Sequence, residues 1–314
     1  MAGWRLLWGA VLLAAAHGAP AQGTGTSGAF PDLPWGSAGA VLGSGATAHV
    51  SDATAVFWNP ARLVRVPDRS FLAGTGDLYG RGLVRHGFAS VVLPRRIRTV
   101  VYDPSGRVAI RDERPMDRAF CLATDVVSLD AFGDAYRETR LHLTYARRSI
   151  GSTAVGVCVK YLSASGDIEG LRGSGYDVDL GWDGPASGRL RAGLIARHVA
   201  SRLSWDGGGV ERLNTRLAAG LTYIWGPRLA FPAGVLWEPS GAGLLEASLG
   251  AEGKPRGDLI SLFAGLRLRP EDDEEILLSA GMALFWKRLR AGYGLTAEDA
   301  GLGETHRFHV GLDF

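Results

Sequence analysis

From Arg69 to Phe314 the chain repeats one pattern, in which segments of about ten residues alternate apolar side chains with polar residues or glycine. The last segment, THRFHVGLDF, places Phe308, Val310, Leu312 and Phe314 on one face and Arg307, His309, Gly311 and Asp313 on the other. A period of two means that one face of an extended strand meets an apolar medium and the other a polar one. Two architectures fit: a soluble β-sandwich with its apolar faces turned inward, or a membrane barrel with those faces turned to lipid.

The number of segments favours the barrel, because a single-chain barrel has an even number of strands that each span the membrane. Fourteen segments can be delimited, at residues 69–76, 83–94, 118–128, 136–149, 151–163, 174–183, 188–199, 212–225, 228–239, 243–253, 258–269, 274–285, 287–297 and 304–314. Residues 95–117 are too long for a short turn, and RTVVYDPSGRVAIRD within them is typical of a hairpin about a D-P-S-G turn. A count of sixteen strands therefore stays open.

The connections and the C-terminus point the same way. Short connections near 150, 184–187 and 226–227 alternate with longer ones at 164–173, 200–211 and 298–303, as expected for periplasmic turns and outer loops. The apolar face of the last segment (Phe308, Val310, Leu312 and Phe314) resembles the signal that the outer-membrane barrel assembly machinery recognises. We therefore predict an all-β fold: a transmembrane antiparallel β-barrel of about fourteen strands over residues 69–314.

The N-terminus predicts export. MAGWRLLWGAVLLAAAHGAPAQ has a basic Arg5, an apolar run at 6–16 and an A-x-A site at 19–21, which is the pattern of a signal peptide over residues 1–21. An N-terminal membrane anchor is the alternative, but the run is too short to span a bilayer. An exported barrel is expected in the bacterial outer membrane, in contact with its lipid.

Residues 40–63, AVLGSGATAHVSDATAVFWNPARL, allow two interpretations. The first residues match G-x-G-x-x-A, a turn found in dinucleotide-binding enzymes. That fold needs alternating strands and helices with an acidic residue further on, whereas only strands follow here. The net charge of +2 also gives no reason to expect a nucleic-acid partner.

The same stretch resembles the N-terminal segment of the FadL family of hydrophobic-compound channels and of the PorV/PorQ group. The matching positions are Gly43, Gly45, Ser51, Asp52, Ala53, Val56, Phe57, Asn59, Pro60, Ala61 and Leu63. Two positions depart from the family pattern: Ser51 stands where a second acidic residue is usual, and Arg62 where glycine is usual. The segments LHLTYARRS, AVGVCVKYL and GLGETHRFHVGLDF also look like PorV/PorQ strands.

This resemblance implies a barrel whose lumen is plugged by an N-terminal hatch, here residues 22–68. Small residues suit a backbone threaded through a lumen, and Asn59 can hydrogen-bond to nearby backbone. The hatch motif has either a structural or a gating role. Its candidate residues are Gly43, Gly45, Asp52, Phe57, Asn59, Pro60 and Ala61.

The phase of the strands turns a set of charged side chains toward the lumen. They are Arg140, Asp177, Asp179, Arg189, Arg191, Arg216, Arg267, Arg290 and Arg307. Such a set can form a basic channel that attracts anionic or amphipathic solutes, or it can be solvated and cross-paired as in other barrel lumens. Cys121 and Cys158 also point inward, on strands about 9.6 Å apart, which predicts free thiols.

The sequence shows no recognisable set of catalytic or metal-binding residues. With two cysteines and scattered histidines we expect no metal and no cofactor, and without a serine, histidine and acid set we expect no enzymatic activity. The acidic run PEDDEE at 270–275 can bind calcium or form a solvated turn, and the turn is favoured.

Two functional hypotheses follow from the resemblance. Likeness to FadL implies a barrel that passes or binds small hydrophobic compounds across the outer membrane. Likeness to PorV implies a non-enzymatic scaffold or shuttle for exported proteins, with secretion-system proteins of a type IX-like apparatus as partners. The short outer connections do not offer the long loops with which FadL-type channels capture ligand, whereas the strand signatures lie closer to PorV/PorQ.

Overall fold

The structure is a computed structural model that describes residues 33, 35–95, 98–102, 108–113, 117–131, 134–149, 152–167, 172–241, 243–270, 275–298 and 303–314. The predicted signal peptide, residues 22–32 of the predicted hatch, the D-P-S-G turn and residues 271–274 of the acidic run lie outside the described residues.

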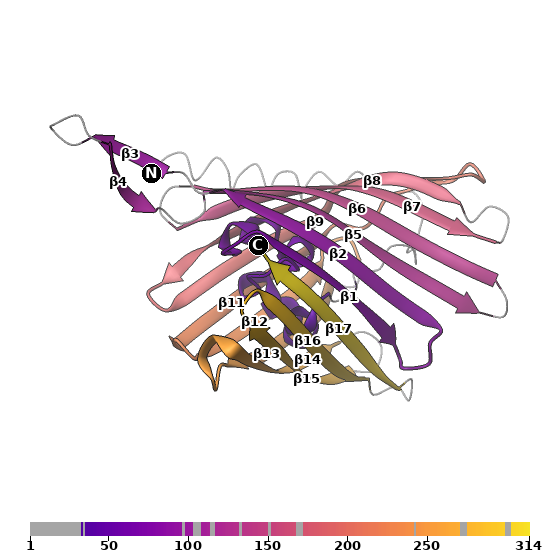
Figure 1. Ribbon diagram of the computed structural model, residues 1–314. Coiled ribbons are helices and arrows are strands. Elements are labelled where there is room, and N and C mark those ends of the chain that lie inside the picture. The colour runs from indigo at the N-terminus through magenta and orange to yellow at the C-terminus, as the bar shows by residue number, and fades with distance from the viewer. Residues whose placement is uncertain are drawn as a thin grey trace.

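Within the described residues, fourteen antiparallel strands close into a barrel (Figure 1). They are β1 (Ser70–Leu78), β2 (Val84–Arg95), β5 (Arg118–Ala131), β6 (Asp134–Arg148), β7 (Ala154–Gly166), β8 (Gly173–Ser187), β9 (Leu190–Trp205), β11 (Arg216–Gly226), β12 (Leu229–Glu238), β13 (Gly243–Gly253), β14 (Ile260–Arg269), β15 (Glu275–Trp286), β16 (Leu289–Glu298) and β17 (Gly303–Asp313). Pairing of β17 with β1, in which Phe71 lies opposite Leu312, closes the ring. A two-residue strand, β10 (Val210–Glu211), pairs with β9.

The segment at 95–117 is a hairpin, as predicted, and it does not add strands to the barrel. Its strands β3 (Arg98–Tyr102) and β4 (Val108–Glu113) pair with each other as a separate sheet that projects from one end of the barrel (Figure 1). The flanking strands β2 and β5 pair directly, with Val92 opposite Cys121. The count of fourteen is therefore confirmed, and the alternative of sixteen is wrong.

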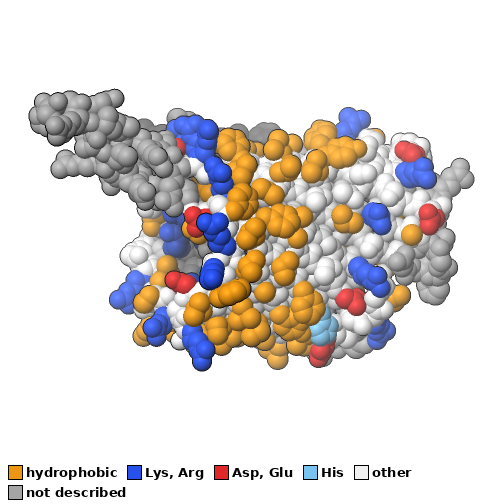
Figure 2. Space-filling view, viewed as in Figure 1, with side chains coloured by type: hydrophobic (Ala, Val, Ile, Leu, Met, Phe, Trp, Pro, Cys, Tyr) orange, Lys and Arg blue, Asp and Glu red, His pale blue; other side chains and the backbone are white. Residues whose placement is uncertain are grey.

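The apolar side chains of the strands face outward, which excludes the β-sandwich. Leu143, Leu249 and Val310 are each more than 60% exposed, whereas their polar neighbours His142, Ser248 and His309 are buried inside. Figure 2 shows hydrophobic side chains gathered across the barrel wall, with charged side chains toward both ends. The predicted assembly-signal residues Phe308, Val310, Leu312 and Phe314 all lie on this outer surface.

β9 is longer than the sequence predicts, because its alternation breaks in the middle. Val178 of β8 pairs with Ala200, but Leu180, two residues on, pairs with Ala196. Two extra residues of β9 are thus accommodated in a bulge, and His198 within it has a φ of 56°. The bulge interrupts the alternation locally, because residues 195–198 are all buried, and this hides the second half of the strand from a search for regular alternation.

Residues 35–66, here called the inner segment, lie inside the barrel as four short helices (Figure 1). The α-helix α2 (Ser37–Leu42) lies against β13–β17, and the 3-10 helix η1 (Gly43–Ala48) lies against β9 and β11–β13. The α-helix α3 (Ala55–Trp58) leads into the 3-10 helix η2 (Pro60–Arg65), which lies against β5–β8. Among the helices described, none is long and apolar enough to cross a membrane.

The hydrophobic core lies where the inner segment meets the wall. Leu42 and Leu63 of the inner segment are fully buried, as are Leu72 and Val92 of the wall. The core is therefore inside the barrel, and the inner segment supplies much of it.

Candidate functional site

Seven consecutive barrel strands carry an inward-facing glycine where the inner segment meets the wall. A Cβ atom added to Gly156 would lie 2.5 Å from the amide nitrogen of Ala61, and one added to Gly234 would lie 2.5 Å from the amide nitrogen of Gly45. At five of the seven positions the nearest atom is inner-segment backbone, and at Gly181 and Gly250 it belongs to the side chains of Asn59 and Leu42, so no position leaves room for a side chain on the wall. These residues, here called the glycine band, are Gly156, Gly181, Gly193, Gly220, Gly234, Gly250 and Gly265.

The predicted hatch glycines lie against β12, β13 and β14, toward one end of this band. Gly43 has a φ of 56°, in the left-handed region that favours glycine. The amide of Ser44 donates to Glu246 Oε1 at 2.7 Å, and the amide of Gly45 donates to Ser248 Oγ at 2.9 Å. Side chains of β13 thus accept hydrogen bonds from backbone amides of η1, which are buried against the wall and have no access to water.

Asn59 joins three parts of the structure. Its Oδ1 accepts from the Ala61 amide at 3.1 Å, and its Nδ2 donates to the carbonyl oxygens of Thr47 at 3.0 Å and Trp182 at 2.9 Å. Pro60 begins η2 beside it, and both residues are buried. Asp52 has a local role as well, since its Oδ1 accepts from the amide of Thr54 at 2.8 Å.

Arg62, which departs from the family pattern, is a centre of the site that sequence reasoning missed. It is 4% exposed, and its Nη1 lies 2.5 Å from Asp183 Oδ1 of β8. Its Nε and Nη2 donate to the carbonyl oxygens of Val50 at 2.6 Å and His49 at 2.7 Å. Burial lowers the pKa of Arg62 to about 10, although Asp183 opposes the shift, so the guanidinium stays charged at neutral pH.

Two more arginines share the same carboxylate. Arg65 of the inner segment and Arg191 of β9 lie 2.8 Å and 2.6 Å from Asp183 Oδ2. Burial also lowers the pKa of Arg65, against the opposing attraction of Asp183. The exit of the inner segment is thus fixed to β8 and β9 through one fully buried aspartate.

On β2 and β6 the inner segment meets the wall through aromatic and imidazole rings. The indole of Trp35 stacks on His86 with centroids 4.7 Å apart, and the ring of Phe57 meets Phe88 at 5.6 Å and His142 at 5.2 Å. These five residues are here called the ring cluster. Gly74 of β1 makes room for it, because a Cβ there would lie 2.5 Å from Phe88 Cε1.

Most of the predicted lumen charges are paired across neighbouring strands. Arg140 lies 2.6 Å from Asp125, Arg290 lies 2.6 Å from Asp313, and Arg216 lies 3.0 Å from Glu238. Arg267 lies 3.9 Å from Glu246, and it and Arg307 both donate to Thr296 at 3.2 Å. This pairing favours the cross-paired interpretation over a basic channel. Arg189 is different: it is exposed in the turn that precedes β9, because the strand begins only at Leu190.

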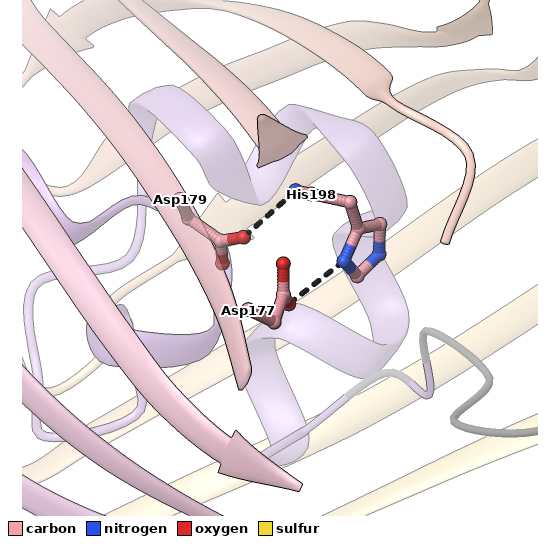
Figure 3. Close-up of side chains that lie close together, drawn as sticks. All are labelled: Asp177, Asp179 and His198. Carbon is pink, nitrogen blue, oxygen red and sulfur yellow. Dashed lines mark hydrogen bonds and ion pairs between the residues drawn. The ribbon is translucent and has the colours of Figure 1, made fainter. Parts of the chain in front are cut away.

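The predicted lumen residues Asp177 and Asp179 meet His198, which the bulge in β9 turns toward them (Figure 3). His198 Nδ1 lies 2.8 Å from Asp177 Oδ2, and its amide donates to Asp179 Oδ1 at 3.1 Å. Potential ligand atoms of all three residues lie within 4.8 Å of one another. Lys160 Nζ, however, lies 2.7 Å from Asp177 and 2.6 Å from Asp179. The lysine already supplies a positive charge to both carboxylates.

A Lys160→Met variant should therefore acquire affinity for Zn²⁺, because two buried carboxylates and an imidazole suit this metal once the ammonium is gone. We expect zinc to raise the unfolding temperature of this variant and to leave the wild type unchanged, as followed by thermal unfolding with and without zinc. A Lys160→Met, His198→Phe double variant serves as the control and should show no zinc effect. An equal shift in the wild type would contradict this account.

A cavity of about 250 Å³ lies between the inner segment and β13–β17. Its lining combines Phe263 and Phe285 with charged residues such as Asp52 and Lys254. His49 Nε2 lies 2.8 Å from Glu252 on its edge. The lumen is therefore polar on this side of the inner segment.

Both cysteines are buried and free, as predicted. Cys121 and Cys158 each lie opposite Thr144 of β6, on its two sides, so one whole strand separates them.

Comparison with known proteins identifies solved structures with a similar fold. No protein-family model and no curated protein matches the sequence. Among solved structures, the chain is similar to the P. putida toluene transporter TodX, with 12% identity, a TM-score of 0.63, and coverage of 89% of this chain and 98% of TodX. The Ralstonia pickettii toluene transporter TbuX gives 12% identity, a TM-score of 0.59, and coverage of 89% and 98%. A Pseudomonas aeruginosa FadL homologue is 11% identical, with a TM-score of 0.50 and coverage of 88% of this chain and 96% of the homologue. The fold is thus that of FadL-like barrels.

Proposed function

We propose that this protein is an outer-membrane barrel that passes or binds small hydrophobic compounds. The observation that carries the proposal is that the lumen is filled. The inner segment packs against the inner face of the wall, and lumen side chains such as Thr222, Arg267 and Arg307 are at most 4% exposed. An interior of this kind disfavours free diffusion of polar solutes through a water-filled pore. A filled interior instead favours a selective route for hydrophobic compounds beside the inner segment.

The likeness in fold to the toluene transporters TodX and TbuX supports this class of substrate. The outward apolar surface and the predicted signal peptide support a location in the outer membrane. We further propose that the protein belongs to the PorV/PorQ branch of this group, on the strand signatures LHLTYARRS and AVGVCVKYL.

The proposal predicts selective uptake. Cells that lack their own hydrophobic-compound channels should take up labelled toluene several-fold faster when they produce this protein than when they produce an unrelated barrel. Uptake of glycerol, a small polar solute, should stay unchanged because the inner segment fills the lumen. Equal increases for both solutes would indicate an open pore. No increase, together with a second polypeptide that co-purifies from the native host, would instead support the secretion-scaffold hypothesis.

A further inference from the structure

The inner segment is held in two different ways on the two sides of the lumen. Along β7–β14 its backbone lies against the glycine band, and its amides donate to wall side chains such as Glu246 and Ser248. Along β2 and β6 the ring cluster fills the space between the inner segment and the wall. Backbone contacts the wall on one side, and side chains bridge the gap on the other.

These two sides differ in what must move to open them. To open the side of the glycine band, the backbone of η1 would have to leave the wall and lose its hydrogen bonds to Glu246 and Ser248. On the other side, Phe57 and Phe88 can turn about their side-chain torsions without breaking a hydrogen bond of their own. A planar solute that enters between the rings would replace the ring contacts that it interrupts.

The ring cluster contains a buried polar atom that has no hydrogen-bond partner among the described residues. His86 is 3% exposed, and its Nδ1 makes no hydrogen bond. The ring of Trp35 covers one face of this imidazole. A buried polar atom without a partner favours any ligand that can bond to it.

We propose that solutes cross the level of the inner segment through the ring cluster, beside β1 and β2, and that His86 Nδ1 binds one hydrogen-bonding group on them. The ligand class is the single-ring aromatic compound with one polar substituent, such as a phenol. This inference rests on the proposed function and adds to it the route, the residues that line it and a preference within the class of hydrophobic compounds.

The route can be tested by fixing the opposite side. Ser44 Oγ and Ser248 Oγ lie 2.9 Å apart, so a Ser44→Cys, Ser248→Cys variant can form a disulfide between η1 and β13 with little movement. We expect equal phenol uptake by the oxidised and the reduced variant, with the single variant Ser44→Cys as the control. Loss of uptake on oxidation alone would overturn the proposal, because it would show that η1 must leave the glycine band.

The recognition step has its own test. Replacement His86→Phe keeps a ring in place and removes the nitrogen, so the ratio of phenol uptake to toluene uptake should fall about fivefold, as expected for one hydrogen bond. Phe57→Ala should raise uptake of both solutes, whereas Phe263→Ala, in the cavity on the other side, should not. Heat-dependent gel mobility confirms that each variant is folded. An unchanged ratio in His86→Phe would overturn the role of His86, and absence of uptake by the wild type would overturn the proposed function itself.

Discussion

An Asp183→Asn variant should have a free energy of unfolding about 3–5 kcal/mol below that of the wild type, the usual cost of removing one partner from a buried ion pair. Asp183 is fully buried, and the guanidinium groups of Arg62, Arg65 and Arg191 all lie within 2.8 Å of its carboxylate oxygens. Asparagine has a similar size but no charge, so three buried or half-buried cations would lose their common anion. Equilibrium unfolding in urea, followed by tryptophan fluorescence in detergent micelles, measures the change.

A matched control comes from the loop after β9. Asp206 is exposed there, and Asp206→Asn should change the free energy of unfolding by less than about 0.5 kcal/mol. If both variants lost the same small amount, the cluster around Asp183 would not fix the inner segment to the wall.

The second large effect is expected in the glycine band. Gly234→Ala places a methyl group 2.5 Å from the amide nitrogen of Gly45, and neither backbone can yield without disturbing the other. Overpacking of this kind costs about 1–3 kcal/mol, and we expect the upper end because only backbone surrounds the site. The urea midpoint of the purified barrel measures the loss.

Gly253→Ala, near the end of β13, provides the comparison for this variant. No atom lies within 4 Å of the added Cβ, and the φ of Gly253 is not positive. This variant should be as stable as the wild type or slightly more stable, because alanine restricts the unfolded chain. Equal destabilisation of the two variants would show that the alanine effect is one of strand propensity and not of contact with the inner segment.

The barrel was predictable because alternation depends only on neighbouring residues. In β17, for example, Arg307 and His309 are buried while Phe308 and Val310 are exposed, as a period of two requires. A closed barrel makes this rule apply to every strand, so local patterns add up to the right count. The hairpin at 95–117 was recognisable for the same reason, from its turn residues.

The site was less predictable, because its contacts join residues far apart in the sequence. His198 reaches Asp177 only through a bulge that breaks the alternation of β9. Asp183 has the inward phase of Asp177 and Asp179, but the predicted strand ended there, so its burial was missed. Arg62 was noticed as a departure from the family pattern, yet nothing in the sequence indicates that Asp183 is its partner.

The glycine band illustrates the same limit. In the sequence its members are the glycines that alternate with apolar residues, and they are indistinguishable from positions that face water. Their role depends on where the inner segment lies, which local pattern does not specify. The ring cluster is similar, since Trp35 and Phe57 meet His86 and Phe88 only after the chain has folded.

The close contacts between the inner segment and the wall constrain the order in which the barrel can assemble. A segment that packs this closely against glycines of seven strands cannot readily be threaded into a barrel that has already closed, because each contact position is accessible only from the lumen. The strands from β7 to β14 would instead have to assemble around it before β17 meets β1. The N-terminal segment would then act as an internal template, and the order of synthesis suits this role because it leaves the ribosome before any strand it organises.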